Sequence, residues 1–294
     1  MSIFKGSGVA LITPFKDGRI DYDALEHLIE WHIESGTDAL IICGTTGEAS
    51  TLSPVEKLSL VEFAVKKVDG RLPVIAGSGS NDTSHALYLS KEMEYVGADG
   101  LLIVTPYYNK ATQSGLIKHY TTIADYVNIP IILYSVKSRT GLNITPDTVK
   151  KLKKHPKICG IKEASGDISQ IAQIAALTDA NFALYSGNDD HTIPVMSLGG
   201  IGCISTVANI IPKEYHQMTS DYLKGKHKSA AKMQLAMLPL IHAVFAEVNP
   251  IPIKAALNMM GLISKEYRLP LCEPTNDTLY LLFDEMNRYG IKIK

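Results

Sequence analysis

The chain has 294 residues, and 29 lysines and arginines nearly balance 30 aspartates and glutamates, which leaves a formal net charge of −1. This balance excludes a strongly basic nucleic-acid-binding protein. With 46% hydrophobic and 20% charged residues, the composition is typical of a globular protein, and the length allows one large domain with an appendage.

Short apolar runs alternate with longer segments of helical periodicity along most of the chain. The runs are continuous rather than alternating in polarity, which is typical of parallel strands covered on both faces. They predict strands at residues 8–12, 39–43, 73–76, 101–104, 130–134, 158–162, 182–185 and 202–205.

The segments between these runs have the features of helices. Leu25, Leu28 and Ile29 lie on one face of a helix, and the pairs at 53–54 and 145–146 place a capping hydroxyl before a proline. Such strand-then-helix units predict a (β/α)8 TIM barrel, although a doubly wound open sheet would show a similar alternation.

The pattern changes after the last predicted strand, where only helical segments interrupted by prolines follow. We therefore expect a catalytic barrel in residues 1–225 and a C-terminal helical extension in residues 226–294. No linker rich in glycine or serine separates them, which argues against an independently moving domain.

Neither the first residues nor the cysteines indicate export. The start of the chain lacks the pattern of a secretory signal, and no apolar run approaches the roughly 18 residues of a membrane span. The four cysteines form no CxxC pair. We expect a cytoplasmic protein that binds neither nucleic acid nor membrane.

Polar residues and glycines gather where the predicted strands end. In a barrel the loops at the carboxyl ends of the strands converge above a packed interior and carry the chemistry. The positions concerned are Thr13, 44–48, 77–79, 105–109, 134–135, 162–163, 186–190 and Ser205.

Lys162 is the most informative of these residues, because it ends an apolar run and should enter the barrel mouth with little water around it. Desolvation disfavours the ammonium and favours the neutral amine that attacks a carbonyl, as in a Schiff base. The alternative is a structural lysine that extends outward or pairs with Glu163 or Glu48.

Imine chemistry also needs a group that moves protons, and the phenol of Tyr134 can do so if a neighbouring hydroxyl relays the proton. A buried tyrosine can instead be structural. The segment Gly44-Thr45-Thr46-Gly47 offers hydroxyls and open backbone N–H groups suited to a small carboxylate, or it forms an ordinary turn.

Motifs for cofactors and metals are weak. No GxxxxGK motif occurs, and Gly77-Ser78-Gly79 lacks the third glycine of a dinucleotide-binding fingerprint. Asp189-Asp190-His191 could bind a metal, but acidic residues at this position more often cap a helix. We expect no cofactor and no metal.

Three separated motifs resemble the dihydrodipicolinate synthase and N-acetylneuraminate lyase superfamily over essentially the whole length of the chain. They are Gly44-Thr45-Thr46-Gly47-Glu48, Tyr134 followed by Arg139-Thr140-Gly141, and Gly160-Ile161-Lys162-Glu163-Ala164. Their joint occurrence in strand order favours a Schiff base on Lys162. The Arg-Thr-Gly motif is similar to dihydrodipicolinate synthases, which condense pyruvate with aspartate semialdehyde on the path to diaminopimelate and lysine.

The resemblance implies the catalytic groups and the assembly. Lys162 would form the imine with pyruvate, and Tyr134 would transfer protons through Thr45 and Tyr108. In the family this last tyrosine enters the site of a neighbouring subunit, so a homo-oligomer is implied, either a dimer or a homotetramer built as a dimer of dimers.

The resemblance also implies how the two substrates are held. Thr46 would bind the pyruvate carboxylate, with help from the backbone near Gly187 and Ile204. Arg139 would receive the carboxylate of the semialdehyde, because a guanidinium fork matches two oxygens.

Two residues depart from the family pattern, which has asparagine or aspartate after the tyrosine and proline two residues further on. Here these positions hold Ser135 and Lys137, and the lysine adds flexibility and charge near the expected substrate entrance. Two alternatives therefore stay open: a pyruvate-dependent aldolase or lyase acting on a sugar acid, and a non-catalytic sensor of keto acids.

A second group of departures concerns regulation by lysine. Asn81 and Tyr107 match the lysine-binding pocket of inhibited family members, whereas Pro54, Lys57 and His85 replace its histidines and glutamate. A cationic side chain and a missing carboxylate disfavour a lysine ammonium, which predicts insensitivity to lysine.

Overall fold

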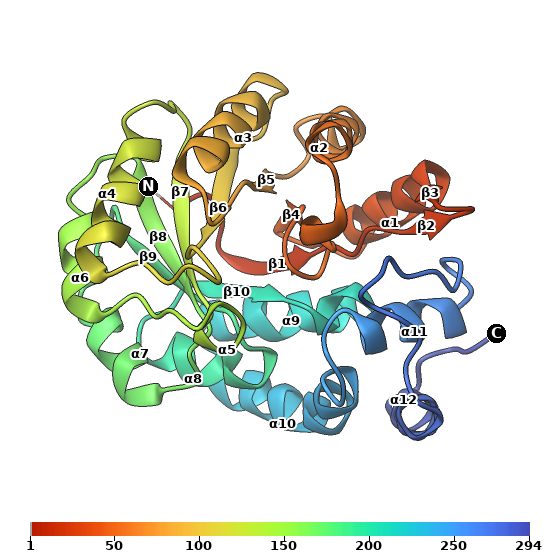
Figure 1. Cartoon of the computed structure of the whole chain (residues 1–294). Coiled ribbons are helices and arrows are strands. Elements are labelled where there is room, and N and C mark those ends of the chain that lie inside the picture. Colours follow the sequence, from red (N-terminus) through yellow and green to blue (C-terminus); the bar gives the residue numbers. More distant parts are fainter. Residues whose placement is uncertain (1) are drawn as a thin grey trace.

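Within residues 2–294, which the computed structural model describes, eight parallel strands close into a barrel (Figure 1). Hydrogen bonding follows chain order, and the last strand pairs with the first. The (β/α)8 prediction is confirmed, and an open doubly wound sheet is excluded. The barrel strands are β1 (Gly6–Ala10), β4 (Ala39–Ile42), β5 (Val74–Gly77), β6 (Gly100–Val104), β7 (Ile131–Ser135), β8 (Ile158–Glu163), β9 (Ala183–Ser186) and β10 (Gly202–Ser205).

Helices follow the strands and surround the barrel. Ser53 and Glu56 form a capping box at the start of α2, and Thr145 caps α6 through the N–H of Thr148, as the Ser-Pro and Thr-Pro pairs predict. The helices are α1 (Tyr22–Glu34), α2 (Pro54–Val68), α3 (Thr83–Tyr95), α4 (Gln113–Ala124), α5 (Lys137–Thr140), α6 (Pro146–Leu152), α7 (Ile168–Ala175), α8 (Thr192–Ser197) and α9 (Pro212–Leu223), with 3-10 turns η1 (Ala49–Thr51), η2 (Asp189–His191) and η3 (Val207–Asn209).

Most other strand bounds differ from the prediction by a single residue, and two differences are larger. The first strand begins two residues before its predicted start, because Gly6 and Ser7 pair with Gly202 and Cys203 of β10. A short antiparallel hairpin of β2 (Phe15–Lys16) and β3 (Arg19–Ile20), which the pattern does not predict, separates β1 from α1.

The C-terminal part consists of α10 (His227–Val244), α11 (Ile251–Met259) and α12 (Asn276–Tyr289). In Figure 1 these blue helices lie beside and below the barrel, and α10 packs against both α9 and α12. Within residues 2–294, no helix combines the length and the apolar character that a bilayer crossing demands.

The amino-terminal side of the barrel interior is filled. Phe4, which precedes β1, stacks on the ring of Tyr185 with centroids 4.5 Å apart, and the tyrosine hydroxyl donates to the Phe4 carbonyl. Both residues belong to a buried apolar cluster inside the barrel. The free space that concerns function therefore lies at the carboxyl ends of the strands.

Candidate active site

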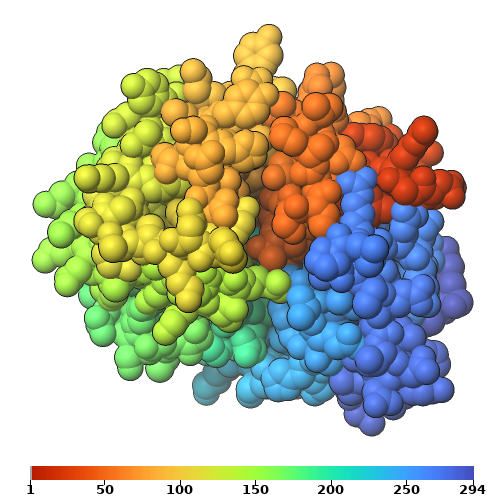
Figure 2. Space-filling view, viewed as in Figure 1, coloured from red at the N-terminus to blue at the C-terminus, as the bar shows by residue number. Residues whose placement is uncertain are grey.

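A cavity of about 390 Å³ lies at the carboxyl ends of the strands, where the surface is hollowed between the orange, yellow and blue segments in Figure 2. It brings together most of the residues predicted for the site. Those among its lining are Thr45, Thr46, Tyr134, Arg139, Lys162 and Gly187.

Lys162 and Tyr134 form the centre of the cavity. They are paired residues of β8 and β7, and each is only 6% exposed. The Lys162 Nζ lies 4.4 Å from the centroid of the Tyr134 ring. The amine is therefore held away from bulk water beside a phenol.

The structural alternatives for Lys162 do not hold in this fold. An outward-extending lysine would be exposed, and both candidate carboxylates are engaged elsewhere. Glu48 pairs with Lys254, and Glu163 accepts hydrogen bonds from the N–H of Ser165 and from a side chain of α7. The lysine faces the cavity rather than a structural ion pair.

The loop after β4 carries the two threonines of the cavity. Thr45 is partly buried, whereas Thr46 is buried and its Oγ1 lies 3.3 Å from Thr206 Oγ1. Gly77 permits the close approach of this loop, because a Cβ there would lie 2.1 Å from the carbonyl oxygen of Cys43. Thr13, which follows β1, also holds this loop, because its Oγ1 donates to the Gly47 carbonyl.

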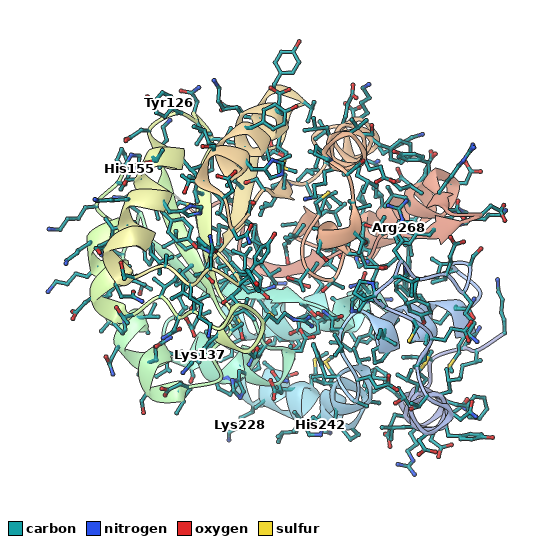
Figure 3. All side chains as sticks on the ribbon, viewed as in Figure 1. Tyr126, Lys137, His155, Lys228, His242 and Arg268 are labelled. Atoms are coloured by element: carbon teal, nitrogen blue, oxygen red, sulfur yellow. The ribbon has the colours of Figure 1, made fainter. Side chains whose placement is uncertain are left out.

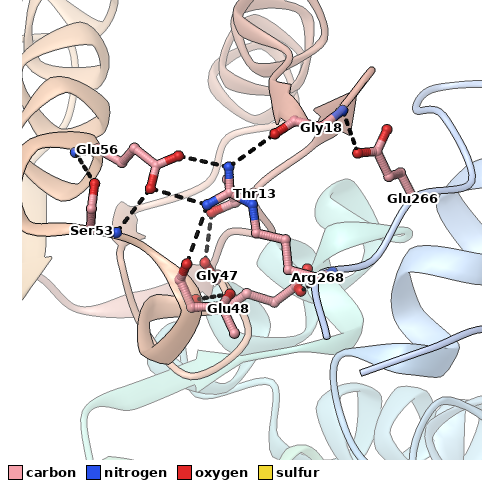
Figure 4. Close-up of polar contacts among 9 residues, drawn as sticks. Thr13, Gly18, Gly47, Glu48, Ser53, Glu56, Glu266 and Arg268 are labelled. Atoms are coloured by element: carbon pink, nitrogen blue, oxygen red, sulfur yellow. Dashed lines mark hydrogen bonds and ion pairs between the residues drawn. The ribbon is translucent and has the colours of Figure 1, made fainter. Parts of the chain in front are cut away.

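The C-terminal segment anchors the same loop. The buried Lys254 of α11 pairs with Glu48, and its Nζ lies 4.3 Å above the ring of Phe15. Figure 4 shows Arg268, whose backbone N–H donates to Glu48 and whose guanidinium donates to Glu56. The extension therefore supports the cavity and does not merely flank it.

Asn249, which sequence analysis missed, connects two predicted residues. Its side-chain amide donates to Thr46 Oγ1 at 2.9 Å, and its backbone carbonyl accepts a 2.9 Å bond from Arg139 Nη2. Asn249 lines the cavity and is buried. In the sequence, Asn249 is marked only as the residue before Pro250, where a helical segment is interrupted.

Gly187 also lines the cavity, at the end of β9. Its N–H donates to the Glu163 carbonyl at 2.7 Å, and a Cβ there would lie 2.6 Å from the Cβ of Ala164. Ile204 is instead buried inside the barrel interior and is not part of the lining. The backbone near these two residues lies at the ends of adjacent strands β9 and β10.

Tyr108 does not join the cavity of its own chain. It is 91% exposed, with φ at 70°, in the loop after β6.

A second cavity of about 260 Å³ adjoins the first, shares Thr45, Tyr134 and Arg139 with it, and is also lined by Tyr107.

Asp189 serves as a cap, although not for its own turn η2. Its carboxylate accepts the backbone N–H groups of Thr206 and Val207 at the start of η3, and the hydroxyl of Tyr215. Burial raises the pKa of this carboxyl. The carboxylate is thus occupied with structural hydrogen bonds.

The two departures from the family motif lie outside both cavities. Ser135 is fully buried and contacts Asn143, whereas Lys137 is exposed at the start of α5 (Figure 3). Neither residue is part of the lining of either cavity. Lys137 is nevertheless on the same short helix as Ser138 and Arg139, which do line the first cavity.

The fold and the polar cavity at the carboxyl ends of its strands define a (β/α)8-barrel enzyme. The model of the Dihydrodipicolinate synthetase family matches residues 3–285. The chain belongs to this family, as its motifs predicted.

Similar proteins extend over the full length. The 4-hydroxy-tetrahydrodipicolinate synthase of Caldicellulosiruptor saccharolyticus is 55% identical over 295 residues, covering 100% of both chains. That of Thermoanaerobacter sp. strain X514 is 53% identical over 292 residues, covering 99% of this chain and 98% of the relative. The crystal structure of dihydrodipicolinate synthase from Aquifex aeolicus has a TM-score of 0.97 at 43% identity, covering 99% of this chain and 100% of that one.

Proposed function

We propose that this chain is a lyase that condenses pyruvate with L-aspartate 4-semialdehyde to 4-hydroxy-tetrahydrodipicolinate in lysine and diaminopimelate biosynthesis. The observation that carries the proposal is the buried Lys162 amine beside Tyr134 at the mouth of the barrel. Full-length relatives at 53% and 55% identity with this activity in their names support it. They do not favour a sugar-acid aldolase or a non-catalytic sensor.

The first half of the reaction forms an imine. The amine of Lys162 attacks the keto carbon of pyruvate, and the carbinolamine loses water as protons move through the Tyr134 hydroxyl, Thr45 and the partner subunit's Tyr108. Loss of a proton from the methyl carbon then gives an enamine. This step needs no metal or other cofactor, because the protonated imine accepts the electron pair.

The second half joins the two substrates. The enamine carbon attacks the aldehyde carbon of the semialdehyde. The aldehyde oxygen then takes a proton and becomes a hydroxyl, and the imine on Lys162 forms again. The amino group of the bound semialdehyde then attacks the imine carbon and releases the Lys162 amine, which closes the ring of the product.

Two carboxylate sites orient the reactants. Thr46, with the backbone near Gly187 and Ile204, holds the carboxylate of pyruvate, and Arg139 holds that of the semialdehyde. Asn249 contacts both Thr46 and Arg139, which supports a fixed spacing between the two sites.

The chain acts as a homo-oligomer in the cytoplasm, either a dimer or a dimer of dimers. Tyr108 is too exposed to serve its own cavity, and the second cavity lies next to Thr45 and Tyr134, where a neighbouring copy could insert this tyrosine. We also propose that residues 1–225, of which Met1 lies outside the described residues, are the catalytic barrel and that residues 226–294 are the extension; the turn between α9 and α10 supports this division.

Borohydride reduction in the presence of pyruvate, followed by peptide mass mapping, tests the function. We expect a covalent pyruvate adduct on Lys162 that is absent from Lys162→Ala, and consumption of aspartate semialdehyde by the unmodified enzyme. An adduct with cleavage of sugar acids alone would support the aldolase alternative. Pyruvate binding without turnover of any aldehyde would support the sensor.

A further inference from the structure

A buried polar network lies behind the cavity, on the outer side of the barrel wall. Ser135 of β7 is paired with Glu163 of β8, one position after the pair of Tyr134 and Lys162. Side chains alternate along a strand, so Tyr134 and Lys162 face the cavity, whereas Ser135 and Glu163 face the surrounding helices. Ser135 and Glu163 are 0% and 1% exposed.

Hydrogen bonds connect these two residues through a pair of amides. Ser135 Oγ donates to Asn143 Oδ1 at 2.9 Å, and the amides of Asn143 and Gln170 bond to each other in both directions. Gln170 Nε2 also donates to Glu163 Oε1 at 3.2 Å, and the same oxygen accepts the Ser165 N–H at 2.8 Å. Four side chains thus join the ends of β7 and β8.

The backbone transmits this connection to the cavity. The N–H of Ala164 donates to the Ser135 carbonyl at 2.9 Å, and Ala164 and Ser165 themselves line the cavity. Glu163 lies directly between these residues and Lys162 in the chain. A shift of its side chain therefore moves the strand end that carries the amine.

The hydrogen-bond partners of Glu163 within residues 2–294 carry no positive charge. Its neighbours in the network are amides, a hydroxyl and a backbone N–H, and its Oε2 is buried without a partner among residues 2–294. Burial raises the pKa of this carboxyl, and the nearby Asp167 acts in the same direction. An uncharged acceptor of the same shape, such as glutamine, should replace it.

We propose that Glu163 is a positioning residue that, through Gln170, Asn143 and Ser135, fixes the separation between the Lys162 amine and the Tyr134 hydroxyl. The inference rests on the roles proposed above for that lysine and tyrosine. None of the four network side chains lines the cavity, so each acts through the strand that carries it. Ser135, which departs from the family motif, belongs to this network.

The consequence is kinetic, because imine formation requires the amine and the proton-transfer group to meet the keto carbon together. A displacement of about 1 Å in such an arrangement can reduce a rate about 100-fold. Loss of Glu163 should therefore slow formation of the imine more than it weakens binding of pyruvate.

Three variants test the proposal in the full-length enzyme: Glu163→Leu, Glu163→Gln and, as a control, Ser169→Ala on the exposed side of α7. The readout is the single-turnover rate of the borohydride-trapped adduct on Lys162, with pyruvate affinity and urea unfolding measured in parallel. We expect a decrease of about 100-fold for the leucine variant and less than about threefold for the glutamine variant. The control should match the wild type.

Ser135→Ala provides a smaller change at the other end of the network, should the leucine variant fail to fold. We expect a slower adduct rate of about threefold or more in this folded variant. Folded Glu163→Leu or Ser135→Ala protein with the wild-type rate would overturn the proposal, as would a glutamine variant as slow as the leucine variant. A wild-type enzyme that forms no adduct would instead contradict the proposed function itself.

Discussion

The guanidinium of Arg139 donates a 2.9 Å hydrogen bond to the backbone carbonyl of Asn249, which lies 110 residues further along the chain. The side-chain amide of Asn249 donates to Thr46, so one residue supports both proposed carboxylate sites. The two contacts differ because the first uses the backbone and the second uses the side chain. A substitution can therefore remove one and leave the other.

Asn249→Ala should impair pyruvate binding selectively. Loss of the bond to Thr46 should raise the KM for pyruvate about tenfold, equivalent to about 1.4 kcal/mol, while the KM for the semialdehyde changes less. Steady-state kinetics with each substrate varied measures both. Asn287→Ala, which removes an exposed amide of α12, is the control. Equal increases in both KM values would contradict the selective role.

Tyr134→Phe should slow imine formation about 10²–10⁴-fold without unfolding the protein, because only the proton-transferring hydroxyl is lost. Trapping with borohydride at successive times measures the rate. Tyr120→Phe makes the same change at a buried tyrosine that donates to the Ile103 carbonyl outside the cavity. That control should lose about 1 kcal/mol of stability and keep its rate. A wild-type rate for Tyr134→Phe would mean that another group moves the protons.

Lys254→Met should destabilise the fold by about 3–5 kcal/mol, because it leaves the Glu48 carboxylate buried without its partner. Urea unfolding measures the loss. Lys66→Met breaks the exposed pair with Glu62 and should cost less than about 0.5 kcal/mol. Similar losses for both variants would show that the buried pair has no special part in anchoring the loop.

L-Lysine should not inhibit the enzyme. Lys57 lines the second cavity together with Tyr107, at a position where inhibited family members have a histidine or a glutamate. Burial lowers the pKa of Lys57, but this side chain carries no negative charge in either protonation state and so cannot attract the ammonium of a bound lysine. Initial rates across a lysine titration measure the response. Strong inhibition at submillimolar lysine would reject the prediction, and Lys57→Glu would then show whether residue 57 contributes.

The sequence predicted the barrel and much of the site because parallel strands bring their carboxyl ends together. That rule alone places Lys162, Tyr134 and Thr46 around one cavity. It could not find Asn249 or Lys254, because their bonds to the loop after β4 span 203 and 206 residues and leave no local pattern.

The outward orientation of Ser135 could also be predicted from the sequence. Tyr134 faces the interior, so the alternation of a strand places the next residue, Ser135, on the outside. The departure at this serine left the substrate open, and its hydroxyl contacts Asn143 behind the barrel wall. The residue that departs from the family motif is therefore part of the proposed hydrogen-bond network behind β7.

Stability at mildly acidic pH should depend on His32, which is fully buried with its Nδ1 2.9 Å from Thr37 Oγ1. Burial lowers the pKa of His32 to about 3. In the unfolded chain the pKa of a histidine is about 6.5, so below that pH the unfolded state binds a proton that the folded state does not. The contribution of neutral His32 is complete above about pH 6.5 and is lost as the pH falls toward the folded value.

His32→Gln removes this titration and should flatten the dependence of stability on pH. Between about pH 6 and pH 5 the wild type should lose about 1 kcal/mol more of its unfolding free energy than the variant does. Urea unfolding at each pH measures the difference. His27→Gln, at an exposed histidine of the same helix α1, should behave as the wild type. Parallel curves for the wild type and His32→Gln would mean that His32 gains a proton in the folded protein as readily as in the unfolded chain.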